Sequence, residues 1–300
     1  MPRIDANGIR IEFDTFGDRR AEPLVLVMGL GGQMLLWDES FCESLARRGH
    51  FVVRFDNRDI GLSTHFDAHG APDLMALMTA ATTGKPIELA YTLDDMADDA
   101  VALIDALGMN DAHFVGASMG GMIVQTVAIR HPARVRSLTS IMSTTGNPSL
   151  PPARPDLLGR LGGPAPVGKQ ANIDASVEMW KLISGPGYPF DEAAIRERSA
   201  QLYERSHHPE GQLRQLAAIM AHGNRAPSLA SVRAPTLVIH GTDDPLVPVE
   251  GGKDTAAAIP GAELILIPGM GHDMPKQLHA TLVDAISTHT QKAAAARGRR

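Results

Sequence analysis

The sequence predicts an α/β protein with a mostly parallel central sheet, helices on both faces of that sheet, and an inserted, mainly helical lid. Short apolar runs that stop at glycine or proline alternate with helix-like segments, which is the order typical of parallel sheets. This alternation breaks over residues 144–227, a stretch too long for a loop in a compact domain. With 300 residues, 44% of them hydrophobic, the chain can form one large domain that carries an insertion.

The predicted strands are of two kinds. Residues 8–17 alternate apolar and polar side chains, which indicates an exposed edge strand. Six later segments are short, continuous apolar runs, the pattern of strands that are buried on both faces of a parallel sheet. These six predicted strands are residues 23–29, 51–55, 113–117, 137–142, 235–241 and 264–267.

Helices are predicted between the strands. They cover residues 37–48, 93–107, 119–131 and 278–292. Thr92 and Asp95 have capping-box spacing, so the second of these helices is expected to begin there. Cys42 is the only cysteine, which excludes an intramolecular disulfide, and its place in the first helix predicts a buried core residue rather than a reactive thiol.

The break in the alternation divides the chain into three parts. Residues 1–143 and 228–300 are expected to form the two parts of the core domain, and residues 144–227 the helical lid. A disordered linker is the alternative for the insertion, but disordered segments are poor in aromatic residues. The insertion contains Trp180, Tyr188, Phe190 and Tyr203. A second long connection, residues 64–91, is expected to be a further part of the lid or a flap near the site.

Charge and composition narrow the range of partners. The net charge of −6 leaves no cationic footprint for nucleic acid or an anionic membrane. The N-terminus lacks a signal pattern and no apolar run approaches the length of a membrane span, so a cytoplasmic protein is expected. No Cys/His cluster has zinc spacing, and neither a metal nor a cofactor is expected. A small molecule is the expected partner, while the oligomeric state stays open, a homo-oligomer included.

The segment Gly-Ala-Ser-Met-Gly, residues 116–120, fits the pattern G-x-S-x-G with Ser118 at its centre. The pattern alone is equally compatible with a glycine-rich turn, because the chain contains 29 glycines. Its position between a predicted strand and a predicted helix favours a nucleophile elbow, in which a strained turn raises the serine at the edge of the sheet. Ser118 is therefore the candidate nucleophile.

A serine nucleophile needs a general base and a carboxylate that orients this base. His272 lies in a glycine-rich loop just after the last predicted strand, and it is the candidate base. His240 is the rival, but its position at a strand end favours an orienting or packing role. Asp243 and Asp244 follow the preceding strand, and either gives the chain order Ser, Asp, His that is found in α/β-hydrolases.

Nearly the whole chain resembles Ser-dependent α/β-hydrolases, of the type exemplified by aclacinomycin methylesterase and its bacterial esterase relatives. The segments that carry the resemblance are residues 27–37, 54–63, 116–121, 240–248 and 268–275. The family's loop spacing before Val-Pro implies that Asp244 is the acid and that Asp243 shapes the loop. The family also implies an oxyanion hole formed by the backbone N–H groups of Leu30 and Met119.

Two departures from the family pattern stand near these motifs. The oxyanion loop usually reads His-Gly-x but here begins at Met28, so any hydrogen bond of that histidine is replaced or missing. Residues 56–63 resemble the family's Asp-x-Arg-Gly-x-Gly-x-Ser turn, with Asp59 where glycine is common, and Asp56 and Arg58 are expected to brace this turn as a pair.

The reaction implied is hydrolysis of a carboxylic ester through an acyl-enzyme, without metal or cofactor. Met28, Met142 and Met270 are expected to line an apolar pocket for a small to medium substrate, since methionine adapts to irregular apolar ligands. Enol-lactonases, carbon–carbon bond hydrolases and cofactor-free perhydrolases on the same scaffold are alternatives. A non-catalytic ligand receptor is an alternative of a different class.

Overall fold

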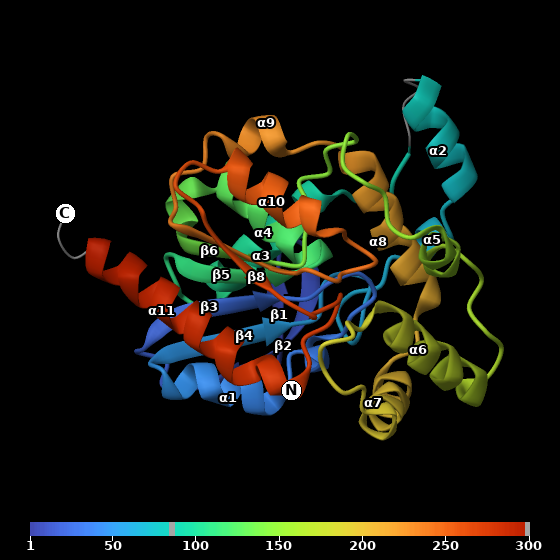
Figure 1. Ribbon diagram of the computed structural model, residues 1–300, viewed down its shortest axis with the longest axis horizontal. Coiled ribbons are helices and arrows are strands. Elements are labelled where there is room, and N and C mark those ends of the chain that lie inside the picture. The colour runs from blue at the N-terminus through green and yellow to red at the C-terminus, as the bar shows by residue number, and fades with distance from the viewer. Residues whose placement is uncertain (84–87, 298–300) are drawn as a thin grey trace.

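A computed structural model describes the chain except for residues 84–87 and 298–300. In the described part, one sheet has the strand order β1-β2-β4-β3-β5-β6-β7-β8 (Figure 1). The strands are β1 (Arg3–Ala6), β2 (Ile9–Phe16), β3 (Glu22–Val27), β4 (His50–Phe55), β5 (Ala112–Ala117), β6 (Val135–Ile141), β7 (Thr236–Gly241) and β8 (Glu263–Ile267). The β1–β2 and β2–β4 pairs are antiparallel and the other described pairs of this sheet are parallel, so the predicted mostly parallel sheet is confirmed.

Helices cover both faces of this sheet. The core helices are α1 (Glu39–Arg47), α3 (Leu93–Ala106), α4 (Met119–Arg130), α10 (Val249–Ala258) and α11 (His279–Arg297). Helices α3 and α4 lie on one face and α1 and α11 on the other (Figure 1). The predicted capping box is confirmed, because the Thr92 hydroxyl accepts from the Asp95 N–H and the Asp95 carboxylate accepts from the Thr92 N–H.

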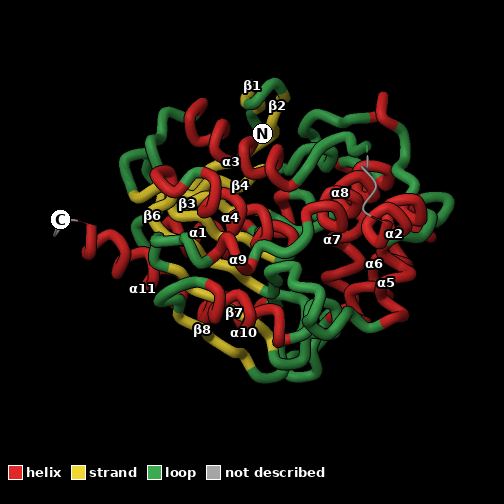
Figure 2. The backbone as a smooth tube through the Cα atoms, turned by 90° about the horizontal axis from the view of Figure 1, so that it is seen from above, coloured by secondary structure: helices red, strands yellow, loops and turns green. Residues whose placement is uncertain are grey.

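Further helices lie at one end of the sheet, and they are α2 (Leu74–Thr83), α5 (Pro155–Leu161), α6 (Lys169–Ile183), α7 (Glu192–Arg205) and α8 (Pro209–His222). The short α9 (Ala226–Leu229) instead contacts α4 and α10 of the core. Helices α5 to α8, called the inserted helices below, follow β6 and gather on one side of the molecule (Figure 2). Helix α2, from the second long connection, contacts α8, and residues 84–87 of that connection lie outside the described residues.

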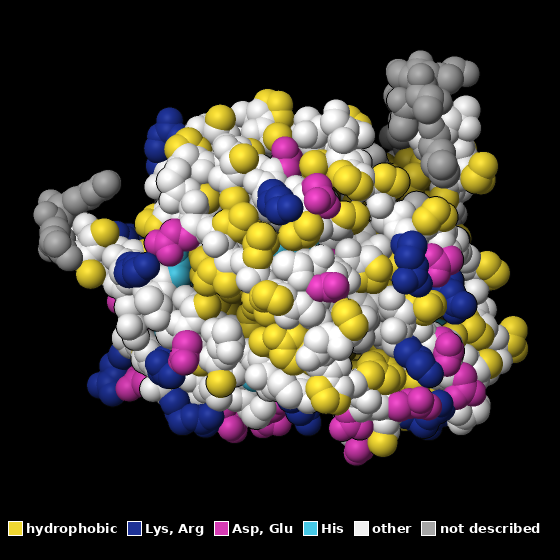
Figure 3. Space-filling view, viewed as in Figure 1, with side chains coloured by type: hydrophobic (Ala, Val, Ile, Leu, Met, Phe, Trp, Pro, Cys, Tyr) yellow, Lys and Arg dark blue, Asp and Glu magenta, His cyan; other side chains and the backbone are white. Residues whose placement is uncertain are grey.

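Two edges of the sheet differ from the prediction. The strand at residues 8–17 is not at the edge, because β1 pairs outside it. Conversely, the sequence predicts that β8 is buried on both faces. In the described structure β8 is an edge strand, because it is last in the strand order and pairs with β7 on one side. Leu264 and Leu266 are therefore 37% and 36% exposed, and hydrophobic side chains gather on the face where β8 lies (Figure 3).

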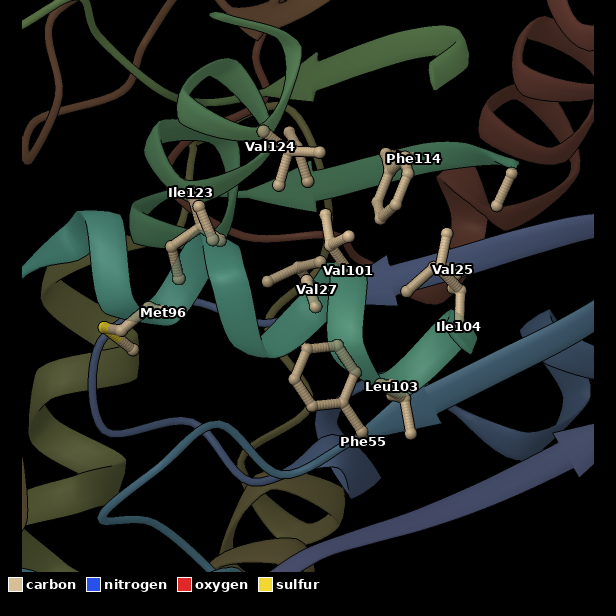
Figure 4. Close-up of a cluster of buried hydrophobic side chains, with 14 of the residues drawn as sticks. Val25, Val27, Phe55, Met96, Val101, Leu103, Ile104, Phe114, Ile123 and Val124 are labelled. Carbon is tan, nitrogen blue, oxygen red and sulfur yellow. The ribbon is translucent and has the colours of Figure 1, made fainter. Parts of the chain in front are cut away.

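The continuous apolar runs are explained by burial on both faces of the inner strands. Alternate residues of a strand point to opposite faces. Val25 and Val27 of β3 meet the helix pair α3 and α4, where they lie close to Phe114 (Figure 4). Leu24 and Leu26 face the opposite cluster, which also holds Cys42 of α1 with no exposed surface. This confirms the predicted burial of Cys42, and burial raises the pKa of its thiol to about 12.

Among the described helices, none combines the length and the apolar character that a membrane span requires.

Candidate active site

Ser118 occupies a strained turn between β5 and α4. Its φ of 57° and ψ of −122° lie outside the regions that side chains other than glycine usually adopt. The close approach of strand and helix explains the neighbouring glycines, since a Cβ atom at Gly116 would lie 2.1 Å from the Gly120 carbonyl oxygen. The turn is held by hydrogen bonds on both sides: the Ser118 N–H donates to Ile141 O (2.9 Å), and the Ser143 hydroxyl donates to Ser118 O (2.8 Å).

The structure brings His272 and Asp244 to this serine. His272 Nε2 lies 2.9 Å from Ser118 Oγ, and His272 Nδ1 lies 2.7 Å from Asp244 Oδ2. The other oxygen of Asp244 accepts from the N–H groups of Leu246 (2.9 Å) and Val247 (2.8 Å), which fixes the carboxylate. Since a carboxylate can only accept, Nδ1 carries the proton and Nε2 is left to accept from the serine hydroxyl.

The two rivals from the sequence lie elsewhere in the hydrogen-bond network. The Asp243 carboxylate accepts from its neighbour Thr242 and from the Gly269 N–H (2.9 Å), and so it joins the loops that follow β7 and β8. His240 is fully buried in β7, where its Nε2 donates to Val247 O at 2.8 Å. Burial lowers the pKa of its imidazole, so this histidine stays neutral and braces the Asp244 loop without reaching the serine.

Leu30 and Met119 line the same cavity as Ser118. Residues 29–32 form a tight turn in which the Gly32 N–H donates to Gly29 O (3.1 Å). A Cβ atom at Gly29 would lie 3.0 Å from Ser118 Cβ, so this turn runs directly beside the serine. In the described part of the chain, the backbone N–H groups of Leu30 and Met119 donate to no protein acceptor. Both groups are thus free to bind a negative oxygen next to Ser118.

The expected pair of Asp56 and Arg58 does not form. Arg58 reaches Asp99 of α3 with two hydrogen bonds of 2.6 and 2.7 Å, and Asp56 is paired with Arg205 of α7 at 2.7 Å. Both residues do brace the turn, but through partners distant in sequence. The family's missing histidine has no direct substitute at Met28, whose carbonyl instead accepts from the Asn57 side chain (2.8 Å).

Ser118 and His272 open into a cavity of about 820 Å³. Its wall from the core includes Met28, Met119, Met122 and Met142, and its wall from the inserted helices includes Met179, Trp180, Leu202, Tyr203, Leu213 and Leu216. Met28 and Met142 thus lie where the sequence analysis placed them. Met270 does not, because it is fully buried in the cluster with α1 and α11 and does not line the cavity. Met122 and Met179 also line the cavity, although the sequence pattern marks them only as ordinary helix residues.

Three potential metal ligands meet outside this site. Donor atoms of His65, Asp67 and His208 lie within 4.8 Å of one another. The two imidazole rings are stacked at 3.9 Å, and His208 Nε2 lies 2.9 Å from the Arg214 guanidinium. A fixed positive charge at that distance opposes a cation, so the arrangement does not favour a metal site.

Known proteins resemble this chain in sequence and in fold. A family model described as alpha/beta hydrolase fold matches residues 22–173, and another, described as TAP-like protein, matches residues 217–295. Rhodomycin D methylesterase DauP of Streptomyces sp. (strain C5) is 31% identical over 97% of this chain and 98% of its own length. The solved meta-cleavage product hydrolase CumD of Pseudomonas fluorescens IP01 has a TM-score of 0.76 at 17% identity, covering 98% of each chain. The enol-lactonase of Burkholderia xenovorans LB400 has a TM-score of 0.71 at 21% identity, covering 97% of this chain and 100% of its own. At these identities the two structures support the fold alone.

Proposed function

The chain belongs to the α/β hydrolase fold family and is a carboxylic ester hydrolase, and we propose that it works through an acyl-enzyme formed on Ser118. The observation that supports this mechanism is the hydrogen-bonded series from Asp244 through His272 to Ser118, which ends in the cavity. A nucleophile, a base and an orienting acid at these distances are what acyl transfer requires.

In the first step, Ser118 Oγ attacks the ester carbonyl carbon while His272 Nε2 takes the hydroxyl proton. The imidazolium that forms is stabilised by Asp244. When the tetrahedral adduct collapses, His272 returns the proton to the departing alcohol. Water then attacks the acyl-enzyme with the same histidine as base, and the carboxylic acid is released.

The negative oxygen of each tetrahedral adduct is assigned to the N–H groups of Leu30 and Met119. Their unused donor capacity and their position beside Ser118 support this role. Loss of one such donor typically costs roughly 3 kcal/mol of transition-state stabilisation. Because both donors belong to the backbone, the missing family histidine does not prevent this chemistry.

For the substrate, we propose a methyl ester of an apolar acid of drug-like size. A cavity of about 820 Å³ with methionine, leucine and aromatic walls has room for such an acid. The similarity to a rhodomycin D methylesterase supports a small alcohol as the leaving group. The cytoplasmic location stays a prediction from the sequence.

We also propose that residues 144–227 act as the lid of this site and select the acid portion of the ester. The inserted helices follow β6, whose carboxyl end lies next to Ser118, and they supply one wall of the cavity. The backbone N–H of His272 donates to Ile183 O at 2.7 Å, so the end of α6 also contacts the catalytic loop. Substrate choice and the position of the base therefore depend on the same segment.

A panel of substrates tests the proposed function. It contains p-nitrophenyl esters of rising chain length, the methyl ester of a bulky aromatic acid, a lactone and a ring-cleavage diketone. We expect release of methanol from the methyl ester by the wild type and none by Ser118→Ala. Faster turnover of the lactone or the diketone than of the esters would show that the proposed ester is not the preferred substrate. Thermal stabilisation by the esters without any turnover would indicate a ligand receptor.

A further inference from the structure

Helix α8 presents one face to the loop that follows β4. Gly211, Arg214 and Gln215 lie on this face, because residues three and four apart are neighbours on a helix. The contact is close: a Cβ atom at Gly211 would lie 2.1 Å from the carbonyl oxygen of Asp59. Any larger residue at this position would push α8 away from the core.

Asp59, which departs from the family pattern, binds this helix. Its carboxylate accepts two hydrogen bonds from Arg214, of 2.7 and 2.8 Å, and both side chains are almost fully buried. The planar guanidinium makes such a two-point contact directional. Asp59 also has a φ of 72°, an unusual conformation for a residue other than glycine. The ion pair therefore fixes α8 in both position and orientation on the core.

Gln215, the next residue of α8, binds the backbone beside the proposed oxyanion hole. Its Oε1 accepts from the Gly31 N–H (2.9 Å) and its Nε2 donates to Arg58 O (2.9 Å). The side chain has no exposed surface. The orientation of the amide is determined by its partners, since one partner can only donate and the other can only accept. Arg58 is in turn anchored to Asp99 of α3, so Gln215 connects the loop to a core helix.

The position of Gly31 explains why this contact matters for Leu30. Gly31 has a φ of 67° and is the third residue of the turn at residues 29–32, where a positive φ favours glycine. The N–H groups of the two central residues of such a turn are not used by the turn itself. Gln215 binds the N–H of Gly31, and the N–H of Leu30 is left for the oxyanion.

We propose that Gln215 is a positioning residue, supplied by the inserted segment, that sets the orientation of the Leu30 N–H through Gly31. The Asp59–Arg214 pair holds Gln215 in place for this task. The inference rests on the proposed function of Ser118 and goes beyond it, since it makes part of the oxyanion hole depend on α8. The inserted helices thus contribute to the chemical step as well as to substrate choice.

Three variants separate a positioning role from a structural one. Gln215→Met removes both hydrogen bonds at similar volume, and Gln215→Glu keeps an oxygen for the Gly31 N–H but loses the donor to Arg58 O. Gln201→Leu is the matched control, because this glutamine of α7 is exposed and its side chain donates to Glu197 of the same helix. We expect kcat for p-nitrophenyl acetate to fall roughly 10- to 100-fold in Gln215→Met, below the loss for a deleted donor, with KM changed little. Gln215→Glu should be intermediate and Gln201→Leu should match the wild type.

Two further readouts make the outcome decisive. Titration of Ser118 with a fluorophosphonate should give the wild-type number of sites in Gln215→Met, at a reduced rate. Hydrogen exchange of the Gly31 amide should be faster in Gln215→Met and unchanged in Gln201→Leu. A kcat loss that follows the number of titratable sites, an unchanged kcat, or unchanged Gly31 exchange would each overturn the inference while leaving the proposed function intact. A wild-type protein whose Ser118 does not react at all would instead overturn the proposed function.

Discussion

The core sheet and the inserted helices are stabilised by different means. Helix α4 of the core buries the ten consecutive residues 119–128, and the inner strands β4 and β5 are buried along their whole length. By contrast, Ser199 is the one buried residue of α7 in the described chain, and the buried residues of α8 include the polar Arg214 and Gln215. Acidic and basic side chains are interspersed over the surface of α6 and α7 (Figure 3).

Polar contacts hold the inserted helices on the core. Three arginines of α7 and α8 each reach an aspartate of the core at 2.7 Å. The pairs are Arg198 with Asp38, Arg205 with Asp56, and Arg214 with Asp59. Apolar burial stabilises a fold without fixing directions, whereas such ion pairs orient one element on another. Because the two regions are held by different interactions, we expect that the stability of the core and the geometry of the cavity can be changed separately.

Removing the proposed nucleophile should give the largest effect on activity and almost none on stability. Ser118→Ala removes a hydroxyl that stabilises neither the sheet nor the inserted helices. Removal of a nucleophilic serine typically lowers kcat by roughly 10⁶-fold. Ester turnover is measured together with thermal unfolding, where we expect nearly the wild-type midpoint. Persistent turnover in a preparation free of contaminating esterase would contradict the assignment of Ser118.

Exchanging the two adjacent acids for amides should separate the catalytic acid from the loop residue. Asp244→Asn offers His272 the wrong hydrogen-bond partner, and such a change typically lowers kcat about 10⁴-fold. Asp243→Asn is the matched control, because its carboxylate accepts from Thr242 and from the Gly269 N–H in the loops after β7 and β8. Steady-state kinetics of both variants check the assignment, and the opposite order of the two losses would reverse it.

The motifs of the proposed catalytic residues are local, which is why the sequence points to them. Ser118, Asp244 and His272 each follow a strand whose apolar run is visible in the sequence, and parallel strands bring their ends to one edge. Arg214 and Gln215 could not be predicted, since their partners lie 155 and 184 residues away and depend on how α8 docks. Helix boundaries and burial of the inner strands follow from periodicity, but docking of one element on another does not.

The two edges of the sheet also depend on tertiary structure that local sequence does not encode, although one edge has a turn signal in the sequence. Leu264 and Leu266 read as a buried strand because strand order is a tertiary property that an apolar run does not encode. The hairpin of β1 and β2, however, is indicated in the sequence by Asn7-Gly8. The φ values of these two residues, 50° and 74°, suit a two-residue turn. The four residues of β1 are too few for a periodic pattern, and the turn dipeptide was the available evidence.

Removing the charge of Asp59 should loosen the inserted helices more than the core. Asp59→Asn leaves the buried Arg214 guanidinium without its counter-charge, and breaking a buried pair in this way costs about 3–5 kcal/mol. We expect faster limited proteolysis within residues 155–222 and a smaller decrease in the unfolding midpoint of the core. Asp174→Asn is the control, because its pair with Arg196 is exposed and screened by solvent, so its loss should change stability little. Equal destabilisation of core and insertion would contradict the comparison.

Low pH should also loosen the inserted helices in the wild type, because it removes the charge of Asp59. Burial alone would raise the pKa of the Asp59 carboxyl, but the hydrogen bonds from Arg214 and the Phe66 N–H have the larger opposite effect. The pKa of Asp59 therefore lies below its ordinary value. A carboxyl with a lowered pKa stabilises the folded state above the unfolded pKa of 3.8, and this contribution is lost as the pH falls through the lowered value. Proteolysis of the inserted helices by an acid-stable protease should therefore increase at low pH in the wild type. In Asp59→Asn this part of the pH dependence should be absent.

The smallest effect is expected from the aromatic side chains of the cavity wall. Trp180 and Tyr203 come from α6 and α7 and line the cavity, whereas Tyr188 packs against the core. Truncation of either wall residue to alanine should raise KM for a bulky aromatic methyl ester by roughly 2- to 10-fold, since a contact between aromatic groups contributes about 0.5–1.5 kcal/mol. The change for p-nitrophenyl acetate should be smaller, because its acyl group is too short to fill the cavity. Tyr188→Ala is the control, expected to lower stability without changing KM for the bulky ester. An equal KM change for both esters would show that these aromatics support the fold of the insertion rather than contact the substrate.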